Sequence, residues 1–181
     1  MLVRFVLLSI FLHLFLTLFS SAQEARQRPS GVAIAAARYK DCYLKITYGQ
    51  PLKRGREIFG KLVPYEKVWR TGANEATELT ITRDILINNQ PLKAGTYSLF
   101  TIPRPESWTI IINSEVGLWG AYNYSDKLDV LRFEVPVQSL KDVVYEPFTI
   151  QIDPKNDKAE VSLLWDKTKV SFPIQFLEPK P

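Results

Sequence analysis

The sequence predicts an all-β domain, and three observations carry that prediction. Short stretches in which apolar and polar residues alternate recur along most of the chain. Clusters of glycine, proline, asparagine and aspartate separate them, as turns separate strands. Helical periodicity over about ten residues occurs only near the N-terminus, with a short helical candidate at 31–38. We therefore expect a single-domain antiparallel β-sandwich, with a closed β-barrel as the alternative.

The stretch CYLKITY at 42–48 shows the alternation clearly, with its aliphatic residues on one face. The same pattern predicts strands at 76–83, 85–87, 96–102, 107–113, 130–137, 146–152, 159–165 and 168–174. Asn88-Asn89 is a turn pair that tolerates positive φ, and a PRPES turn joins the strands on either side of it into a hairpin. Pro136 places its strand at an edge of the sheet or marks the end of the strand.

The chain begins with a pattern typical of a secretory signal peptide. Arg4 supplies a short positive segment, Phe5–Phe19 form an apolar run of 15 residues, and Ser20-Ser21-Ala22 are the small residues that a signal peptidase reads. We expect cleavage after Ala22 and export to the periplasm or out of the cell. The run is shorter than the roughly 20 residues of a membrane-spanning helix, so an uncleaved anchor is the secondary interpretation and we expect no stable membrane insertion after cleavage.

The predicted signal peptide at 1–22 leaves a flexible lead-in at 23–31, one domain at 32–177 and a short tail at 178–181. This length suits one domain with its own hydrophobic core. The net charge of the full chain is +4, and removal of Arg4 lowers it by one. Such a mild basic excess does not indicate a nucleic-acid partner.

His13 is the only histidine, and it lies within the predicted signal peptide. Without an imidazole, the mature chain cannot form a Ser-His-Asp or Cys-His catalytic site, and zinc, copper or iron would lack their commonest ligand. Cys42 is the only cysteine, so neither an internal disulfide nor a cysteine metal cluster can form, and we expect it to be buried. We therefore expect no metal and no cofactor.

One long segment, 51–77, interrupts the strand pattern and contains three of the eight glycines and six basic residues. Irregular segments of this length in a compact domain are usually functional, and this one has too many large apolar residues to be disordered. Its stretch VWRTGANEAT combines four candidate site residues: Trp69, Arg70, Asn74 and Glu75. Gly72 lets the backbone turn between them, and Asn74 can follow in a left-handed conformation.

Two interpretations of this segment stay open. In the structural one, Arg70 pairs with Glu75 beneath Trp69 and braces the loop, and the basic run at 53–56 is a solvated surface. In the functional one, the planar guanidinium of Arg70 binds a carboxylate or phosphate. Arg54 and Arg56 would then join it in an anion pocket.

A second cluster, LWGAYNY at 118–124, presents Trp119 and Tyr122 as a stacking platform for a sugar or a flat ligand, or else as part of the core. A hydrolase that uses carboxylates alone is conceivable with Glu75 as its acid, although no spacing pairs Glu75 with a second acid. The acidic turns at 125–129 and 153–157 lack the ordered alternation of a calcium-binding loop.

Several segments resemble a known family: GREIFGKLVPYEKVWRTGANEAT, AGTYSLFTIP with WTIIIN, WGAYNY with DVLRFEVPV, and LLWDKTKVSFPI. From about Pro29 to Phe176, the chain resembles the bacterial family of exported proteins called domain of unknown function 2911. Lys93, Arg104 and the run YGQP depart from the family pattern, all outside the VWRTGANEAT stretch. The resemblance implies an exported, mostly β, single-domain bacterial protein and brings no established activity, substrate or catalytic residue.

The leading hypothesis is a non-catalytic binding module in the periplasm or outside the cell. Its partner would be a small anionic or polyhydroxylated, sugar-like ligand held by three arginines against an aromatic wall, with the contacts made by Arg54, Arg56, Arg70, Trp69, Trp119 and Tyr122. Two alternatives stay open. One is a glycosidase-like hydrolase that uses Glu75, and the other is a structural or assembly protein of the cell envelope.

Overall fold

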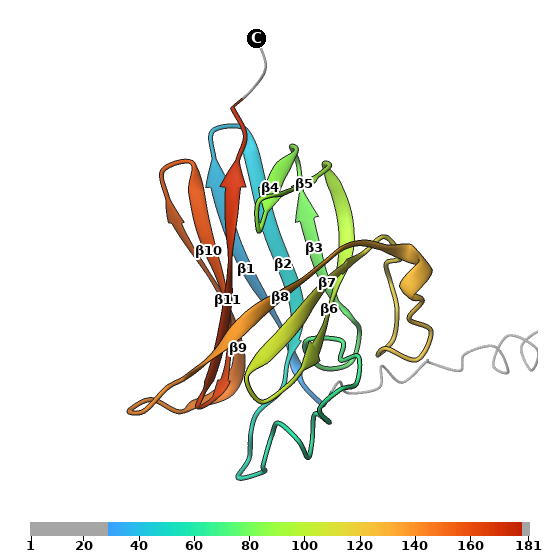
Figure 1. The fold of residues 1–181 in the computed structure, drawn as a ribbon, viewed down its shortest axis with the longest axis vertical. Coiled ribbons are helices and arrows are strands. Elements are labelled where there is room, and N and C mark those ends of the chain that lie inside the picture. Colours follow the sequence, from blue (N-terminus) through green and yellow to red (C-terminus); the bar gives the residue numbers. More distant parts are fainter. Residues whose placement is uncertain (1–28, 179–181) are drawn as a thin grey trace, which may run out of the picture.

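The computed structural model describes residues 29–178, which form eleven strands and one short 3₁₀ turn at Asp126–Leu128 (Figure 1). The strands are β1 (Gly31–Tyr39), β2 (Cys42–Gln50), β3 (Thr77–Ile81), β4 (Ile85–Ile87), β5 (Gln90–Leu92), β6 (Gly95–Pro103), β7 (Ser107–Asn113), β8 (Asp129–Ser139), β9 (Tyr145–Lys155), β10 (Lys158–Asp166) and β11 (Thr168–Phe176). Every strand that the alternation predicts is present, because one face of each is buried in a common core.

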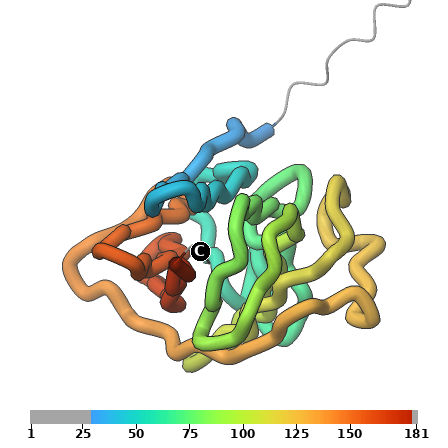
Figure 2. Tube along the Cα trace, turned by 90° about the horizontal axis from the view of Figure 1, so that it is seen from above, coloured from blue at the N-terminus to red at the C-terminus, as the bar shows by residue number. Residues whose placement is uncertain are grey.

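All the strand pairs are antiparallel and belong to one sheet in the order β1-β2-β3-β6-β7-β8-β11-β10-β9, with the β4–β5 hairpin attached to β11. Seen end-on, the strands are arranged in a ring, and β9 lies beside β1 (Figure 2). The predicted all-β antiparallel domain is therefore confirmed. Of the two arrangements considered, the structure has a single sheet nearly closed into a barrel.

Side chains of β2 bridge the gap between the two ends of the sheet. The Tyr48 hydroxyl accepts a hydrogen bond from the Ile150 N–H at 3.0 Å, and Gln50 Nε2 donates to the Phe148 carbonyl at 3.2 Å. Just beyond β2, the Pro51 carbonyl accepts from the Phe148 N–H at 2.8 Å. Burial raises the pKa of the Tyr48 hydroxyl. Tyr48 therefore provides a neutral polar group at the closure point, where β9 would otherwise leave a backbone donor unpaired.

Segment 51–77 crosses the lower end of the barrel (Figure 1). Aromatic side chains of this segment pack against aromatic side chains of the strands. The Trp69 indole stacks on Trp165 with ring centroids 5.9 Å apart, and it meets Trp108 edge-on at 6.0 Å. Phe59 and Phe148 approach Trp69 edge-on at 6.2 and 5.1 Å. Such pairs add attraction to the area that they bury. The cluster thus attaches the segment to the barrel wall.

The helical candidate at 31–38 is wrong, because these residues form strand β1. Each residue from Gly31 to Tyr39 is paired with β2. Small side chains at Ala33, Ala35 and Ala37 face the core, whereas Ile34 is exposed. Alanine favours a helix in isolation, but pairing with a neighbouring strand outweighs that preference here.

Pro136 does not lie at a sheet edge, since β8 has β7 on one side and β11 on the other. Its partner Ser107 is the first residue of β7, and pairing of β8 with β11 begins at Val137. Pro136 thus stands where β8 changes partner, so the missing N–H interrupts neither ladder. The short strand β5 lies outside the strands that the sequence pattern predicts.

The predicted signal peptide at 1–22 lies outside the described residues, as do residues 23–28 and 179–181. Within residues 29–178, no helix has the length and apolar character needed to span a membrane.

Gly49 in β2 is a position where the fold excludes any side chain. A Cβ atom there would lie 1.9 Å from the Ala73 carbonyl oxygen. We expect Gly49→Ala to lower the free energy of unfolding by about 3 kcal/mol, at the upper end of overpacking costs, because a backbone atom cannot rotate away. Urea denaturation measures the change.

The matched control is Gly31→Ala, since a Cβ atom at Gly31 meets nothing within 4 Å. This variant should stay within about 1 kcal/mol of the wild type. Equal urea midpoints for the two variants would contradict the proposed close approach.

Candidate ligand-binding site

Segment 51–77 has no regular strand and is tied to the barrel by isolated bridges. Leu52 pairs with Pro147 at the start of β9, and Trp69 pairs with Thr101 in β6. The Trp69 N–H donates to the Thr101 carbonyl at 2.7 Å, and the Thr101 N–H donates back at 2.9 Å. These pairs fix both ends of the segment on opposite parts of the sheet.

The turn after Trp69 has an unusual backbone. Thr71 is fully buried and has a φ of 54°, which is uncommon for a β-branched residue. Its hydroxyl donates to Thr101 Oγ1 at 3.1 Å, and its carbonyl accepts from Thr77 Oγ1 at 2.7 Å. Asn74 follows with a φ of 63°. Buried strain of this kind persists only when the surrounding contacts hold it, and it concentrates at functional sites.

A cavity of about 280 Å³ opens beside this turn. Its walls come from the lead-in, the basic loop, the turn and β10, and its lining residues are Pro29, Ser30, Pro51, Leu52, Arg54, Arg56, Leu62, Val63, Trp69, Arg70, Gly72, Ala73, Asn74 and Trp165. The structure thus brings five of the predicted site residues together around one space.

Arg70 is the most unusual member of this lining. Its Nε atom is buried and has no hydrogen-bond partner among the residues that the structure describes. Within the same residues, Arg70 takes part in no ion pair, so the expected pairing with Glu75 is not formed. Burial lowers the pKa of the Arg70 guanidinium, and only the nearby Tyr122 hydroxyl opposes that shift. A buried cation without a counter-ion is unfavourable and favours an anion beside it.

The other two arginines of the lining, Arg54 and Arg56, differ from Arg70 in their contacts and exposure. Arg56 folds back onto its own loop, where Nε donates to the Lys53 carbonyl at 2.9 Å and Nη2 donates to the Leu52 carbonyl at 2.6 Å. Arg54 is exposed, and its backbone N–H donates to Glu146 Oε1 at 2.6 Å. Arg56 therefore shapes the rim, whereas the Arg54 side chain is presented to solvent beside the opening.

Asn74 and Glu75 face different spaces. Asn74 lines the cavity and donates from Nδ2 to the Ser30 carbonyl at 3.1 Å. Glu75 forms an isolated bridge with Trp119 and lines a separate hollow that it shares with Glu78. Glu75 is not among the residues that line the Arg70 cavity.

Trp119 and Tyr122 are surface residues with exposed fractions of 58% and 83%, and neither lines the cavity. Their loop is nevertheless joined to the turn, because the Ala76 N–H donates to the Leu118 carbonyl at 2.8 Å and the Gly120 N–H donates to the Asn74 carbonyl at 2.9 Å. The aromatic cluster therefore lies next to the cavity and does not form its wall.

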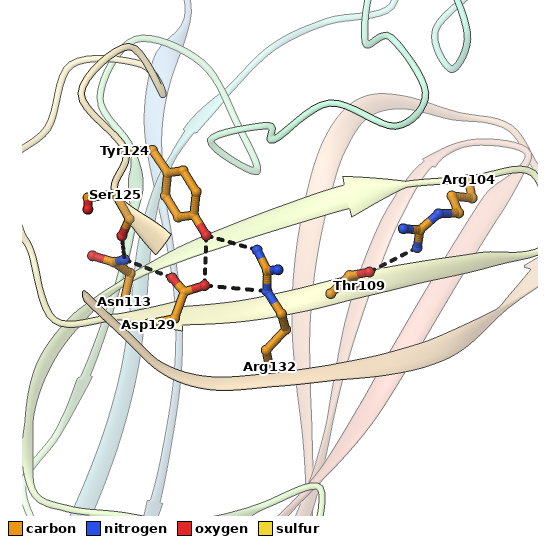
Figure 3. Close-up of polar contacts among 7 residues, drawn as sticks. All are labelled: Arg104, Thr109, Asn113, Tyr124, Ser125, Asp129 and Arg132. Carbon is orange, nitrogen blue, oxygen red and sulfur yellow. Dashed lines mark hydrogen bonds and ion pairs between the residues drawn. The ribbon is translucent and has the colours of Figure 1, made fainter. Parts of the chain in front are cut away.

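A polar network holds this loop in place (Figure 3). Asp129 accepts hydrogen bonds from the Tyr124 hydroxyl at 2.7 Å and from Asn113 Nδ2 at 2.9 Å, and Arg132 Nη2 donates to the Tyr124 oxygen at 2.9 Å. Asn113 Nδ2 also donates to the Ser125 carbonyl at 2.9 Å. The network anchors the loop on β7 and β8.

Sequence reasoning did not identify the lining residues Pro29, Ser30 and Trp165. Pro29 and Ser30 were assigned to a lead-in, and Trp165 was one aromatic residue of an ordinary predicted strand. No local pattern signals that these residues share a cavity, because only closure of the sheet brings them together. In the described part of the chain, no three His, Cys, Asp or Glu side chains converge to hold a metal ion.

Tyr124 has a testable pH signature. Burial, together with the hydrogen bond to Asp129, raises the pKa of Tyr124 to about 12. Because the native pKa lies above the unfolded value of about 10, the neutral hydroxyl stabilises the fold below pH 10 and that stabilisation is lost as the pH rises from 10 to 12. The absorbance difference at 295 nm between the wild type and Tyr124→Phe should therefore titrate near pH 12.

In urea, the same difference should titrate at the ordinary tyrosine value of about 10. A native midpoint that equals the midpoint in urea would show that the network leaves the hydroxyl unperturbed.

The Arg70→Met variant distinguishes a brace from a ligand-binding residue. Methionine keeps an apolar chain and removes a buried charge that lacks a partner, so the melting temperature should stay unchanged or rise. The control, Arg56→Met, loses two hydrogen bonds to loop carbonyls. It should lower the melting temperature by about 2–4 °C per kcal/mol lost. A clear loss of stability in Arg70→Met would support the structural interpretation.

Comparison with known proteins identifies the family. The sequence model of a family described as a protein of unknown function (DUF2911) matches residues 30–174, a range that contains segment 51–77, the loop at 114–128 and nearly all the strands. Searches of curated proteins and of solved structures gave no match. The match covers most of the chain and confirms the resemblance seen in the sequence. The chain belongs to the DUF2911 family of proteins of unknown function.

Proposed function

We propose that this protein is an exported binding module that holds a small anionic ligand in the cavity at the lower end of its barrel. The observation that supports this proposal is the Arg70 guanidinium, which is partly buried in the cavity wall with an Nε that has no partner among the described residues. A ligand anion would supply the missing acceptor and the missing negative charge.

The lining favours binding over catalysis. Among residues 29–178, those that line the cavity include no carboxylate, cysteine or histidine. General acid–base and nucleophilic catalysis most often use such groups close to the reacting atoms. The acid expected for a hydrolase, Glu75, lines the other hollow. The lining therefore suits recognition of an anion better than its chemical conversion.

Exposed basic residues at the rim suit the same role. Arg54 lies beside the opening, and the net charge of the full chain is +4. A basic rim attracts anions and raises their association rate, while the buried charge determines how long they stay. An exported location follows from the predicted signal peptide and forms part of the proposal.

A thermal-shift assay on the mature chain tests this function. The probes are sulfate, phosphate, benzoate and glucose, and the variants are the wild type and Arg70→Met. At ten times its dissociation constant, a bound anion stabilises the native state by about 1.4 kcal/mol. That stabilisation corresponds to about 3–5 °C in melting temperature. We expect at least one anion to stabilise the wild type and to have no effect on Arg70→Met.

Lys141→Met is the matched control, because Lys141 is exposed and lies in the connection between β8 and β9. It changes the net charge by the same amount and should respond to anions as the wild type does. An anion response that survives in Arg70→Met would show that binding occurs elsewhere. A response to glucose alone would replace the anionic ligand with a polyhydroxylated one.

A further inference from the structure

We infer that the ligand is a small monocarboxylate with an apolar body, an inference that rests on the proposed anion-binding function. The cavity is lined by Arg70, whose buried Nε lacks a partner among the described residues, and by several apolar side chains. The charge, the donor geometry and the apolar walls each support this assignment.

The number of charges that the cavity provides is the first argument. Arg70 is the only arginine of the lining that is not exposed, whereas Arg54 and Arg56 lie at the rim. Two of the Arg56 donors are already used on loop carbonyls. A phosphate group carries roughly 1.5 to 2 negative charges and three strong acceptor oxygens at neutral pH. One guanidinium balances the single charge of a carboxylate, whereas it would leave part of the charge and one oxygen of a phosphate group unpaired.

The donor geometry is the second argument. A guanidinium presents its N–H groups in a planar fork that matches the two oxygens of a carboxylate. The Arg70 Nε is buried and has no protein partner among the described residues, so a carboxylate that reached it would give this N–H an acceptor and form one arm of such a pair. The rest of the guanidinium can supply the second arm. A monocarboxylate can thus use the fork in full.

The apolar walls are the third argument. Pro51, Leu52, Val63, Trp69 and Trp165 line the same cavity as Arg70. A polyhydroxylated body would lose hydrogen bonds to water wherever it lay against these apolar side chains. Asn74 offers one carboxamide, whose Nδ2 already donates to the Ser30 carbonyl. An aliphatic or aromatic body gains free energy from the same burial.

The size of the cavity limits the body. Its volume of about 280 Å³ lies near the lower limit of the range typical of small-molecule sites, about 300–1,000 Å³. A single ring or a short branched chain suits this space. Benzoate is therefore a fitting probe, and phenylphosphonate and benzyl alcohol carry the same ring with a different head group.

Isothermal titration calorimetry of these three compounds tests the inference. For the wild type, we expect benzoate to bind at least tenfold more tightly than phenylphosphonate or benzyl alcohol. A charge-assisted hydrogen-bond pair is worth roughly a tenfold effect or more, so Arg70→Met should weaken benzoate binding at least tenfold. Lys141→Met should leave it unchanged.

The indole N–H signals in a proton–nitrogen NMR spectrum show where benzoate binds. The chain has four tryptophans, and Trp165 lines the cavity whereas Trp119 lies outside it. Single Trp→Phe variants assign the signals. Benzoate should shift the Trp165 signal and leave the Trp119 signal in place.

The outcomes distinguish failure of the monocarboxylate inference from failure of the anion-binding function. Tighter binding of phenylphosphonate that depends on Arg70 would overturn the monocarboxylate and leave the anion-binding function standing. If benzyl alcohol binds as tightly as benzoate, or if Arg70→Met binds benzoate like the wild type, both are overturned. Binding of none of the three compounds, together with no response to phosphate or sulfate in the thermal-shift assay, would also overturn both.

Discussion

The backbone contact between Gly49 and Ala73 determines where segment 51–77 crosses the barrel, and the cavity depends on it. The Ala73 N–H donates to the Gly49 carbonyl at 3.1 Å, and a side chain on Gly49 would collide with the Ala73 carbonyl. Gly72 makes the same approach from the other side, because a Cβ atom there would lie 2.8 Å from the Gly49 carbonyl oxygen. Two glycines thus let the turn lie directly on β2, and Arg70 stands just before this contact.

Holding Arg70 in that position carries a cost in stability. A guanidinium in a partly buried wall loses water, and the described residues give its Nε nothing in return. The aromatic cluster around Trp69 and the hydrogen bonds of Thr71 and Thr77 offset the cost, since they fix the turn independently of Arg70. A turn that needed Arg70 as a brace would provide it with an acidic partner. The absence of such a partner among the described residues fits the proposed binding role, in which a residue trades stability for function.

The sequence pattern predicted nine of the eleven strands, because a strand with one buried face shows its period of two directly in the sequence. Strand β1 was not predicted because its inward-facing residues are alanines, while the larger apolar residue Ile34 lies on the outer face. The sequence therefore shows no clear alternation of apolar and polar residues there. The sequence predicted only part of the candidate site. Its glycine, arginine and tryptophan residues identified the segment, but the spacing suggested an ion pair between Arg70 and Glu75. The bridge between Glu75 and Trp119 turns that carboxylate away, and such a pairing between distant segments cannot be read from local sequence.

The walls of the cavity are anchored separately, which has a consequence for affinity. Lys53 forms a partly buried ion pair with Asp166 at 2.7 Å and fixes the basic loop. The turn is fixed by its contact with β2. Since the basic loop and the turn are each held by their own contacts, binding of a ligand would not have to order these two walls. Ordering of loops and side chains is one of the main costs of association, so a preformed cavity lets even one buried ion pair and a small apolar surface produce measurable binding.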